Sequence, residues 1–422
     1  MNNIILLVNE TKFLLPIIAL LGLSIIVSLV AKTLKLGFVP TFVIDIIIGI
    51  ALKQIFFNET YINEYGSITE IMYTIGFILI MFISGFDNNF FSKDIISNSE
   101  QKMGINIKRK VVLLLCFVYI CSLITSLFFM NNYENIVGGT ALLTIVISST
   151  FAGVVVPMVK EEHLSKTILG NFIIYFSTIS ELSSIVLLTI FMFITKFELL
   201  RMLAYLGLVL LFILIYFLNK VLNKSSKRIT SGLTHMPVRI IFVILSGCVV
   251  LCEVAGGEYV LGAFLLGMFL RKIDFSEHTI EKIESICFGL FAPIFFIIIG
   301  TKINIRMFIE NPRWLLTVLL LVVAFVISKA PLIYLKKWYN GKTIMIAMSL
   351  TCCTLVVGLT ASHLGEVHHI ISYEFAQCII SASIITCIIT SIMYESFFPY
   401  YLRKIKKQEK EIKCDYGSEG IA

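Results

Sequence analysis

The sequence is poor in charge. Only 14% of its 422 residues are Asp, Glu, Lys or Arg, and 58% are hydrophobic, whereas a soluble domain is about 25% charged. This shortage excludes an ordinary soluble protein. Apolar runs of 18 or more residues recur between residues 13 and 398, which is long enough for helices to cross a hydrocarbon core of about 30 Å. The alternating apolar and polar pattern of a membrane β-barrel is lacking.

Other signatures are missing too. The 10 cysteines lack disulfide or zinc spacing, so we interpret them as small packing residues. There is no G-x-G-x-x-G nucleotide fingerprint, no mid-span arginine that would suit an organic-anion transporter, and no evident nucleophile–base pair. We therefore expect neither an enzyme nor a cofactor. The opening "MNNIILLVNETK" is not basic, and no A-x-A-like cleavage site follows, so we expect residues 13–31 to be an uncleaved span.

The apolar runs predict an all-α polytopic membrane protein in which residues 1–422 form a single membrane transport domain. We expect about 13 transmembrane helices, and the polar residues within two of them predict helices that are broken inside the membrane. The expected spans are 13–31, 38–55, 69–86, 110–130, 137–159, 168–195, 202–219, 238–255, 259–270, 284–301, 314–335, 343–362 and 370–398.

The basic residues predict the orientation of these spans. With the N-terminus outside and the C-terminus in the cytoplasm, 26 of the 34 lysines and arginines fall on the inner side and 7 on the outer. This is the bias of the positive-inside rule. We expect a multi-pass protein of the cell membrane whose positive inner face lies against anionic lipid, with no nucleic-acid partner.

Three pairs of segments suggest an internal repeat. "VIDIIIG" (43–49) resembles "LGAFLLG" (261–267), "MFISGFDNN" (81–89) resembles "FIIIGTKIN" (296–304), and "SSTFAGVVVP" (148–157) resembles "SLTCCTLVVG" (349–358). The offset is seven spans each time, and an odd offset gives two halves of inverted topology, as in secondary transporters. The predicted layout is a first repeat at 13–195, a linker helix at 202–219, a second repeat at 238–398 and a cytoplasmic tail at 399–422.

The two predicted broken helices are spans 137–159 and 343–362. Unwound backbone at membrane depth frees carbonyl groups that can coordinate a cation. The alternative is that the hydroxyls bond back to their own helices. The interrupting polar and small residues are Ser148, Ser149, Thr150, Gly153 and Pro157 in the first, and Ser349, Thr351, Thr354 and Gly358 in the second.

Three ionisable residues lie deep within expected spans. Glu181 is surrounded by hydroxyls in "YFSTISELSSIVLLTI" (175–190), Lys329 lies in "FVISKAPLIYL", and Asp45 lies in the second span. Such groups are costly in a bilayer and are functional by default. A carboxylate is a hard ligand that can hold a proton or a monovalent cation, and the surrounding hydroxyls could complete the shell. The alternatives are an ion pair between Glu181 and Lys329, snorkelling of Lys329 to the interface, and a contact between helices for Asp45.

The motifs resemble those of a known family. "LGFVPTFVIDIIIGIAL", "GFILIMFISGFDNN", "ISSTFAGVVVPMVKEE", "YVLGAFLLGMFL" and "LFAPIFFIIIGTKINI" are similar to segments of the bacterial cation:proton antiporter family, within the sodium/proton exchanger superfamily, over residues 13–398. The resemblance implies that Glu181 is the ion-binding carboxylate, that Ser180 takes the place of the first member of the family's acidic pair, and that Lys329 is the basic partner. Thr150 falls on the family's broken-helix threonine.

Two positions depart from the family pattern. Its Arg-Gly-Glu in the twelfth span is here Cys352-Cys353-Thr354, and Asp45 stands where a tyrosine is usual.

The function that we expect is therefore exchange of protons for a monovalent cation. Sodium is the first choice and lithium or potassium are the others, with alternating access around Glu181. The ion-binding set is Glu181, Ser180, Thr150 and Ser149, with Asp45, Thr354 and Thr351 as further candidates. A homodimer is what the resemblance implies. The alternative function is a divergent relative that transports nothing and acts as a membrane sensor or partner protein.

Overall fold

The structure is a computed structural model, and the regular elements among its described residues are all helices. Nine described segments are long and apolar enough to cross a membrane, so the chain is a multi-pass membrane protein. The predicted linker helix at 202–219 and the tail at 399–422 lie outside the described residues, and the count of thirteen spans stays a prediction. The structure describes residues 18–26, 29, 41–55, 59–86, 107–130, 136–161, 167–195, 236–254, 259–271, 277–337 and 341–394.

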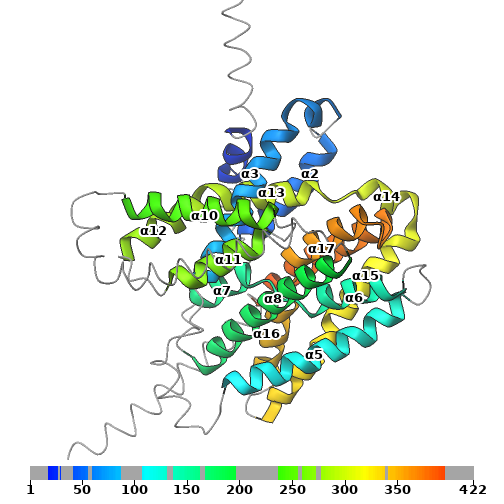
Figure 1. Ribbon diagram of the computed structural model, residues 1–422. Coiled ribbons are helices and arrows are strands. Elements are labelled where there is room, and N and C mark those ends of the chain that lie inside the picture. The colour runs from blue at the N-terminus through cyan, green and yellow to red at the C-terminus, as the bar shows by residue number, and fades with distance from the viewer. Residues whose placement is uncertain are drawn as a thin grey trace, which may run out of the picture.

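The described helices fall into two groups (Figure 1). The first group, called here the scaffold group, contains α2 (Thr41–Ile55), α3 (Glu59–Phe86), α10 (Met236–Val254), α11 (Tyr259–Leu270), α12 (Glu277–Ile286), the π-helical turn η2 (Cys287–Phe291) and α13 (Ala292–Thr301). The second group, called the core group, contains α5 (Ile107–Met130), α6 (Ile136–Ser148), α7 (Ala152–Glu161), α8 (Ile168–Thr195), α15 (Pro312–Ser328), η3 (Ala330–Lys337), α16 (Gly341–Cys352), α17 (Val356–Val367) and the last described helix, Tyr373–Tyr394. The short α14 (Ile305–Glu310) connects them.

Four glycines hold the scaffold group together at close range. A Cβ on Gly49 of α2 would collide with the backbone of α13, and one on Gly300 of α13 would collide with the backbone of α2. Gly85 of α3 and Gly267 of α11 meet in the same way. The similar segments noted in the sequence match Gly49 to Gly267 and Gly85 to Gly300. A two-fold operation that exchanges the two halves would therefore turn the contact between Gly49 and Gly300 into the contact between Gly267 and Gly85. This arrangement is the one expected of two repeats related by a two-fold operation.

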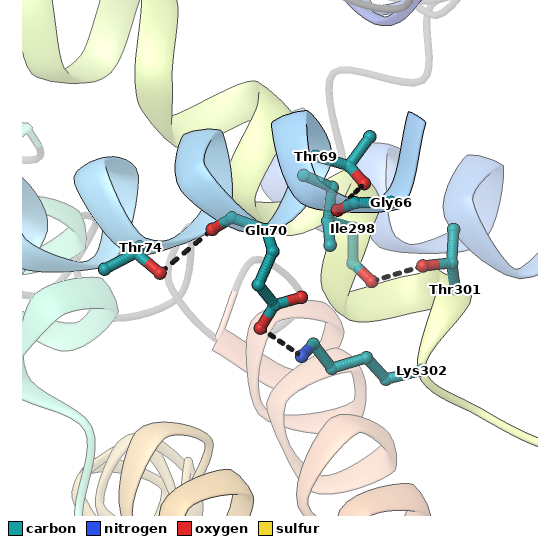
Figure 2. A network of polar contacts seen from close by, with 7 residues as sticks. All are labelled: Gly66, Thr69, Glu70, Thr74, Ile298, Thr301 and Lys302. Atoms are coloured by element: carbon teal, nitrogen blue, oxygen red, sulfur yellow. Dashed lines mark hydrogen bonds and ion pairs between the residues drawn. The ribbon is translucent and has the colours of Figure 1, made fainter. Parts of the chain in front are cut away.

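Aromatic and polar contacts complete the scaffold group. Phe77 of α3 stacks on Phe295 of α13 with ring centroids 5.3 Å apart. At one end of these helices, Lys302 lies 3.6 Å from the Glu70 carboxylate and over the Tyr73 ring, as Figure 2 shows for the ion pair. Nearby threonines bond back to carbonyls of their own helices (Figure 2). The scaffold helices are thus fastened mainly by backbone approach and aromatic packing.

Both predicted broken helices are confirmed. Residues 149–151 separate α6 from α7, and residues 353–355 separate α16 from α17. The middle residue of each break is a threonine, Thr150 or Thr354. Our sequence pairing set Thr150 opposite Thr351 and is therefore wrong by three residues, because it matched serines, threonines and valines and not the points where the helices end.

Candidate ion-binding site

Glu181 lies on α8, opposite the break between α6 and α7. Its side chain is 0% exposed. The Oε2 atom accepts a hydrogen bond of 3.0 Å from the backbone N–H of Ala152, the first residue of α7. The other oxygen, Oε1, is buried and has no hydrogen-bond partner among the described residues. One carboxylate oxygen is therefore fixed by a helix N-terminus, and the other is open to a further ligand.

Lys329 lies on the other side of the same break. Its ammonium, also 0% exposed, donates to the carbonyl oxygens of Ser148 (2.6 Å) and Ser149 (3.0 Å) and to Thr150 Oγ1 (3.5 Å). An ammonium has three donors, so these acceptors account for all of them. The carbonyls that the end of α6 frees are thus occupied by the protein's own cation.

Among the described residues, Glu181 and Lys329 do not form the ion pair that the sequence suggested. Instead, Glu181 accepts from the N-terminus of α7 and Lys329 donates to the C-terminus of α6. A helix carries roughly half a positive charge at its N-terminus and half a negative charge at its C-terminus. Each buried charge therefore meets the complementary end of a half-helix.

Two threonines join the two breaks across the repeat. Thr150 Oγ1 donates to the carbonyl oxygen of Thr351 at 2.8 Å, and Thr354 Oγ1 donates to that of Ser149 at 2.9 Å. The backbone N–H of Phe151 donates to the carbonyl of Cys353 at 2.6 Å. Both breaks thus form one crossing.

Ser180 Oγ donates to the Ser148 carbonyl at 2.9 Å and ties α8 to this crossing. It shares that acceptor with the Lys329 ammonium.

The other hydroxyls near Glu181 do not form a shell around it, which corrects our expectation. Ser177, Thr178 and Ser183 bond back to carbonyls of α8 itself, and Ser184 meets the Tyr119 hydroxyl of α5 at 3.0 Å. The same back-bonding holds in the broken helices for Ser148, Ser149, Ser349 and Thr351. For these residues the alternative of bonding within their own helix is the one observed, because each carbonyl lies three or four residues back.

A model of the family described as "Sodium/hydrogen exchanger, transmembrane" matches residues 18–398. The chain belongs to this family. It is 28% identical over 382 residues to "Putative Na(+)/H(+) antiporter YjbQ" of Bacillus subtilis (strain 168). The matched residues make up 88% of this chain and 61% of that protein. This chain thus spans about three fifths of the length of YjbQ.

For two further relatives, the match covers most of both chains. One is "Probable Na(+)/H(+) antiporter 3" of Methanocaldococcus jannaschii, 24% identical over 386 residues, with 88% of this chain and 94% of the relative covered. The other is the solved structure of the sodium proton antiporter MjNhaP1 from M. jannaschii at pH 8, with a TM-score of 0.58 and 17% identity over 91% of this chain and 96% of that one. The structural match shows that the two share a fold.

Asp45 of this exchanger-family chain lies in the scaffold group, on α2. It is buried and accepts a hydrogen bond of 2.9 Å from Ser24 Oγ in the helical segment 18–26. The structure therefore places it in a contact between helices, one of the two possibilities that the sequence left open, and not at the crossing.

Sequence reasoning missed how Lys329 reaches the crossing. We expected an unbroken span at 314–335, but α15 ends at Ser328 and a 3₁₀ segment follows. Pro331 is the signal that was overlooked, because proline removes a backbone donor and ends an α-helix. Lys329 therefore lies at a helix end, and its buried ammonium does not snorkel to the interface.

Sequence reasoning also missed the pairing of the Cys353 and Cys387 thiols at 3.2 Å. Their spacing in sequence gives no hint of it. Among the described residues, no group of three or more His, Cys, Asp or Glu side chains could hold a metal ion.

Proposed function

We propose that this chain is a secondary antiporter that exchanges protons for a monovalent cation across a cell membrane. The observation that carries the proposal is the buried Glu181 carboxylate, with Oε2 held by the Ala152 N–H and Oε1 open. An intramembrane carboxylate with a free oxygen can bind a proton or a cation, and the two compete for the same charge.

The exchange step is a replacement at Glu181. A cation arriving from one side displaces the carboxyl proton, and the carboxylate then holds the cation in its place. Lys329 stays charged on the α6 carbonyls throughout and keeps the break open. Thr150, Ser149 and Ser180 are the neighbouring groups that would contribute oxygen ligands once the cation binds, with Thr351 and Thr354 supporting the crossing.

Sodium is the proposed ion, with lithium or potassium as the others. A carboxylate and hydroxyl groups are hard oxygen ligands, which suit alkali cations. The names of the relatives favour sodium, since YjbQ and the M. jannaschii relative are both named as Na(+)/H(+) antiporters. A relative of Bacillus cereus that is 29% identical over 100 residues is named as a Na(+)/H(+)-K(+) antiporter, which keeps potassium in the set to be tested.

Alternating access would arise from movement of the core group against the scaffold group. Packing supports this division, because α2 with α13 and α3 with α11 meet backbone to backbone within the scaffold group. The contacts between groups run through α3 with α7 and α8 with α11. Both α7 and α8 contribute to the Glu181 site, so sliding at this boundary would move the site relative to the scaffold.

The orientation proposed is N-terminus outside and C-terminus in the cytoplasm, with the basic inner face against anionic lipid and two chains forming a homodimer. Single-cysteine variants test the orientation, in a background in which Cys116 and Cys414 are serine. We expect Glu366→Cys to react with an impermeant maleimide from outside and Lys282→Cys only from inside. The reverse labelling would overturn the orientation, and cross-linking in native membrane tests the dimer.

The transport test uses the full chain in proteoliposomes that contain a pH-sensitive dye. An inward gradient of sodium, lithium or potassium should drive protons out for the preferred ion, and Glu181→Gln should abolish this flux because an amide does not titrate. Glu310→Gln, which makes the same change at an exposed acid of α14, is the matched control and should behave as wild type. Absence of ion-driven flux for all three ions would favour the sensor or partner-protein function instead.

A further inference from the structure

Two thiols meet in the interior at a place that the exchange step does not use. The Sγ atoms of Cys353 and Cys387 lie 3.2 Å apart, and both side chains are 0% exposed. Cys353 is the first residue of the break 353–355, whereas Cys387 lies on the last described helix. The pair is a contact between two elements, 34 residues apart in sequence.

We propose that Cys353 and Cys387 form a thiol modification site, which a peroxide converts into a disulfide that arrests the transporter. A disulfide needs its sulfur atoms at about 2.05 Å, so the two must approach by roughly 1.2 Å. The break supplies that freedom, because residues 353–355 are not in a helix. The inferred arrest rests on the proposed exchange function, whereas the disulfide itself does not.

The chemistry balances with one molecule of hydrogen peroxide. One cysteine loses its proton, and its sulfur attacks a peroxide oxygen. The O–O bond breaks to give a sulfenic acid and a hydroxide, which takes up the proton as water. The second sulfur then attacks the sulfenic sulfur, the S–O bond breaks, and a second water leaves with the second thiol proton. Two thiols and one peroxide thus become one disulfide and two waters, and a reducing dithiol reverses the change.

A route for the peroxide exists if the site exchanges ions. Cys353 and Glu181 are joined through adjacent residues, because the Phe151 N–H donates to the Cys353 carbonyl and the Ala152 N–H donates to the Glu181 carboxylate. A path that brings a hydrated cation and a proton to Glu181 also brings a neutral molecule of nearly the size of water. Cys353 and Cys387 are therefore open to oxidation during turnover although both are buried in this structure.

The position of Cys353 explains why a disulfide would stop transport. Its carbonyl accepts the Phe151 N–H at 2.6 Å, and the next residue, Thr354, donates to the Ser149 carbonyl. Cys353 is thus where one broken helix holds the other. A covalent tie to Cys387 fixes that crossing to the last described helix, so the crossing can no longer adjust around the ion.

A second thiol pair provides an internal control. Cys248 and Cys252 lie one turn apart on α10, buried against α11, where Cys248 donates to the Gly262 carbonyl. They belong to the scaffold group, on a helix that packs against α11 and α12. Oxidation there should leave transport unchanged.

The test treats the full chain in proteoliposomes with hydrogen peroxide, alkylates the remaining thiols and maps the peptides by mass spectrometry. We expect a peptide that joins Cys353 to Cys387, together with a loss of flux that dithiothreitol restores. Cys387→Ser should keep its flux under peroxide and give no joined peptide, whereas Cys248→Ser/Cys252→Ser should respond as wild type does.

Full alkylation of Cys353 and Cys387 after peroxide would overturn the modification site. A joined peptide with undiminished flux would overturn the arrest. Absence of flux before any oxidation would instead count against the proposed exchange, and the peptide map would still decide whether the disulfide forms.

Discussion

Glu181 and Lys329 lie at the two sides of one helix break, and each binds the half-helix end of opposite charge. Glu181 accepts from Ala152 at the start of α7, while Lys329 donates to Ser148 and Ser149 at the end of α6. Neither charge depends on the other for its hydrogen bonds. The carboxylate can therefore change its partner between proton and cation without releasing the lysine.

Lys329→Met tests this independence. The change removes the ammonium from the Ser148 and Ser149 carbonyls, which keep the Ser180 and Thr354 hydroxyls as donors, and we expect unfolding to become easier by about 1–3 kcal/mol for the lost charged hydrogen bonds. The cost should be nearly the same in a Glu181→Gln background, because no hydrogen bond or ion pair joins the two side chains and each binds its own half-helix end. Thermal unfolding in detergent measures both. Lys336→Met, at an exposed lysine of η3, is the control and should change little.

A coupling of about 3 kcal/mol or more between Lys329→Met and Glu181→Gln would contradict the geometry. A coupling of that size is the signature of a buried ion pair that has lost one member.

Removing a crossing threonine should loosen the site without unfolding the chain. Thr150→Val and Thr354→Val each delete one bond between the breaks, worth about 1 kcal/mol, and we expect a weaker apparent affinity for the driving cation. The readout is flux against cation concentration. Thr189→Val is the matched control, because the buried Thr189 hydroxyl bonds only within α8. Equal affinity in all three variants would make Thr150 and Thr354 packing residues.

The scaffold glycines should not tolerate a methyl group. Gly267→Ala forces a Cβ into the α3 backbone at Phe82 and Phe86, and we expect a loss of about 1–3 kcal/mol from overpacking. Gly247→Ala places the same methyl on α10, where no described atom lies within 4 Å. There the change should stabilise by about 0.5–1 kcal/mol, since glycine is costly inside a helix. Thermal unfolding distinguishes the two, and similar shifts would contradict the close approach of α11 and α3.

Much of the fold was predictable because bilayer physics constrains it strongly. Span length and the cost of intramembrane charge located the helices and singled out Glu181 and Lys329. The glycine echoes were predictive because a backbone approach such as that of Gly85 to Gly267 admits no other residue. Polar interruptions likewise marked both breaks.

The partners of each side chain could not be predicted in the same way. Sequence spacing does not say whether a hydroxyl will bond back three or four residues, as at Ser177, or cross to another element, as at Ser180. The register of the second break was misplaced because it depends on where α16 ends in space. Lys329 was paired with Glu181 by charge and by the family resemblance, since the carbonyls that hold it carry no signature in the side-chain sequence.

The most direct test of the central claim is the number of protons released when a cation binds. Calorimetry of the solubilised chain, in buffers of different ionisation enthalpy, gives this number at a pH where Glu181 is protonated. The account predicts that each bound sodium displaces one proton, as a single carboxyl group allows, and that Glu181→Gln releases none while Glu310→Gln matches wild type. Sodium binding without proton release, or unchanged release in Glu181→Gln, would contradict it.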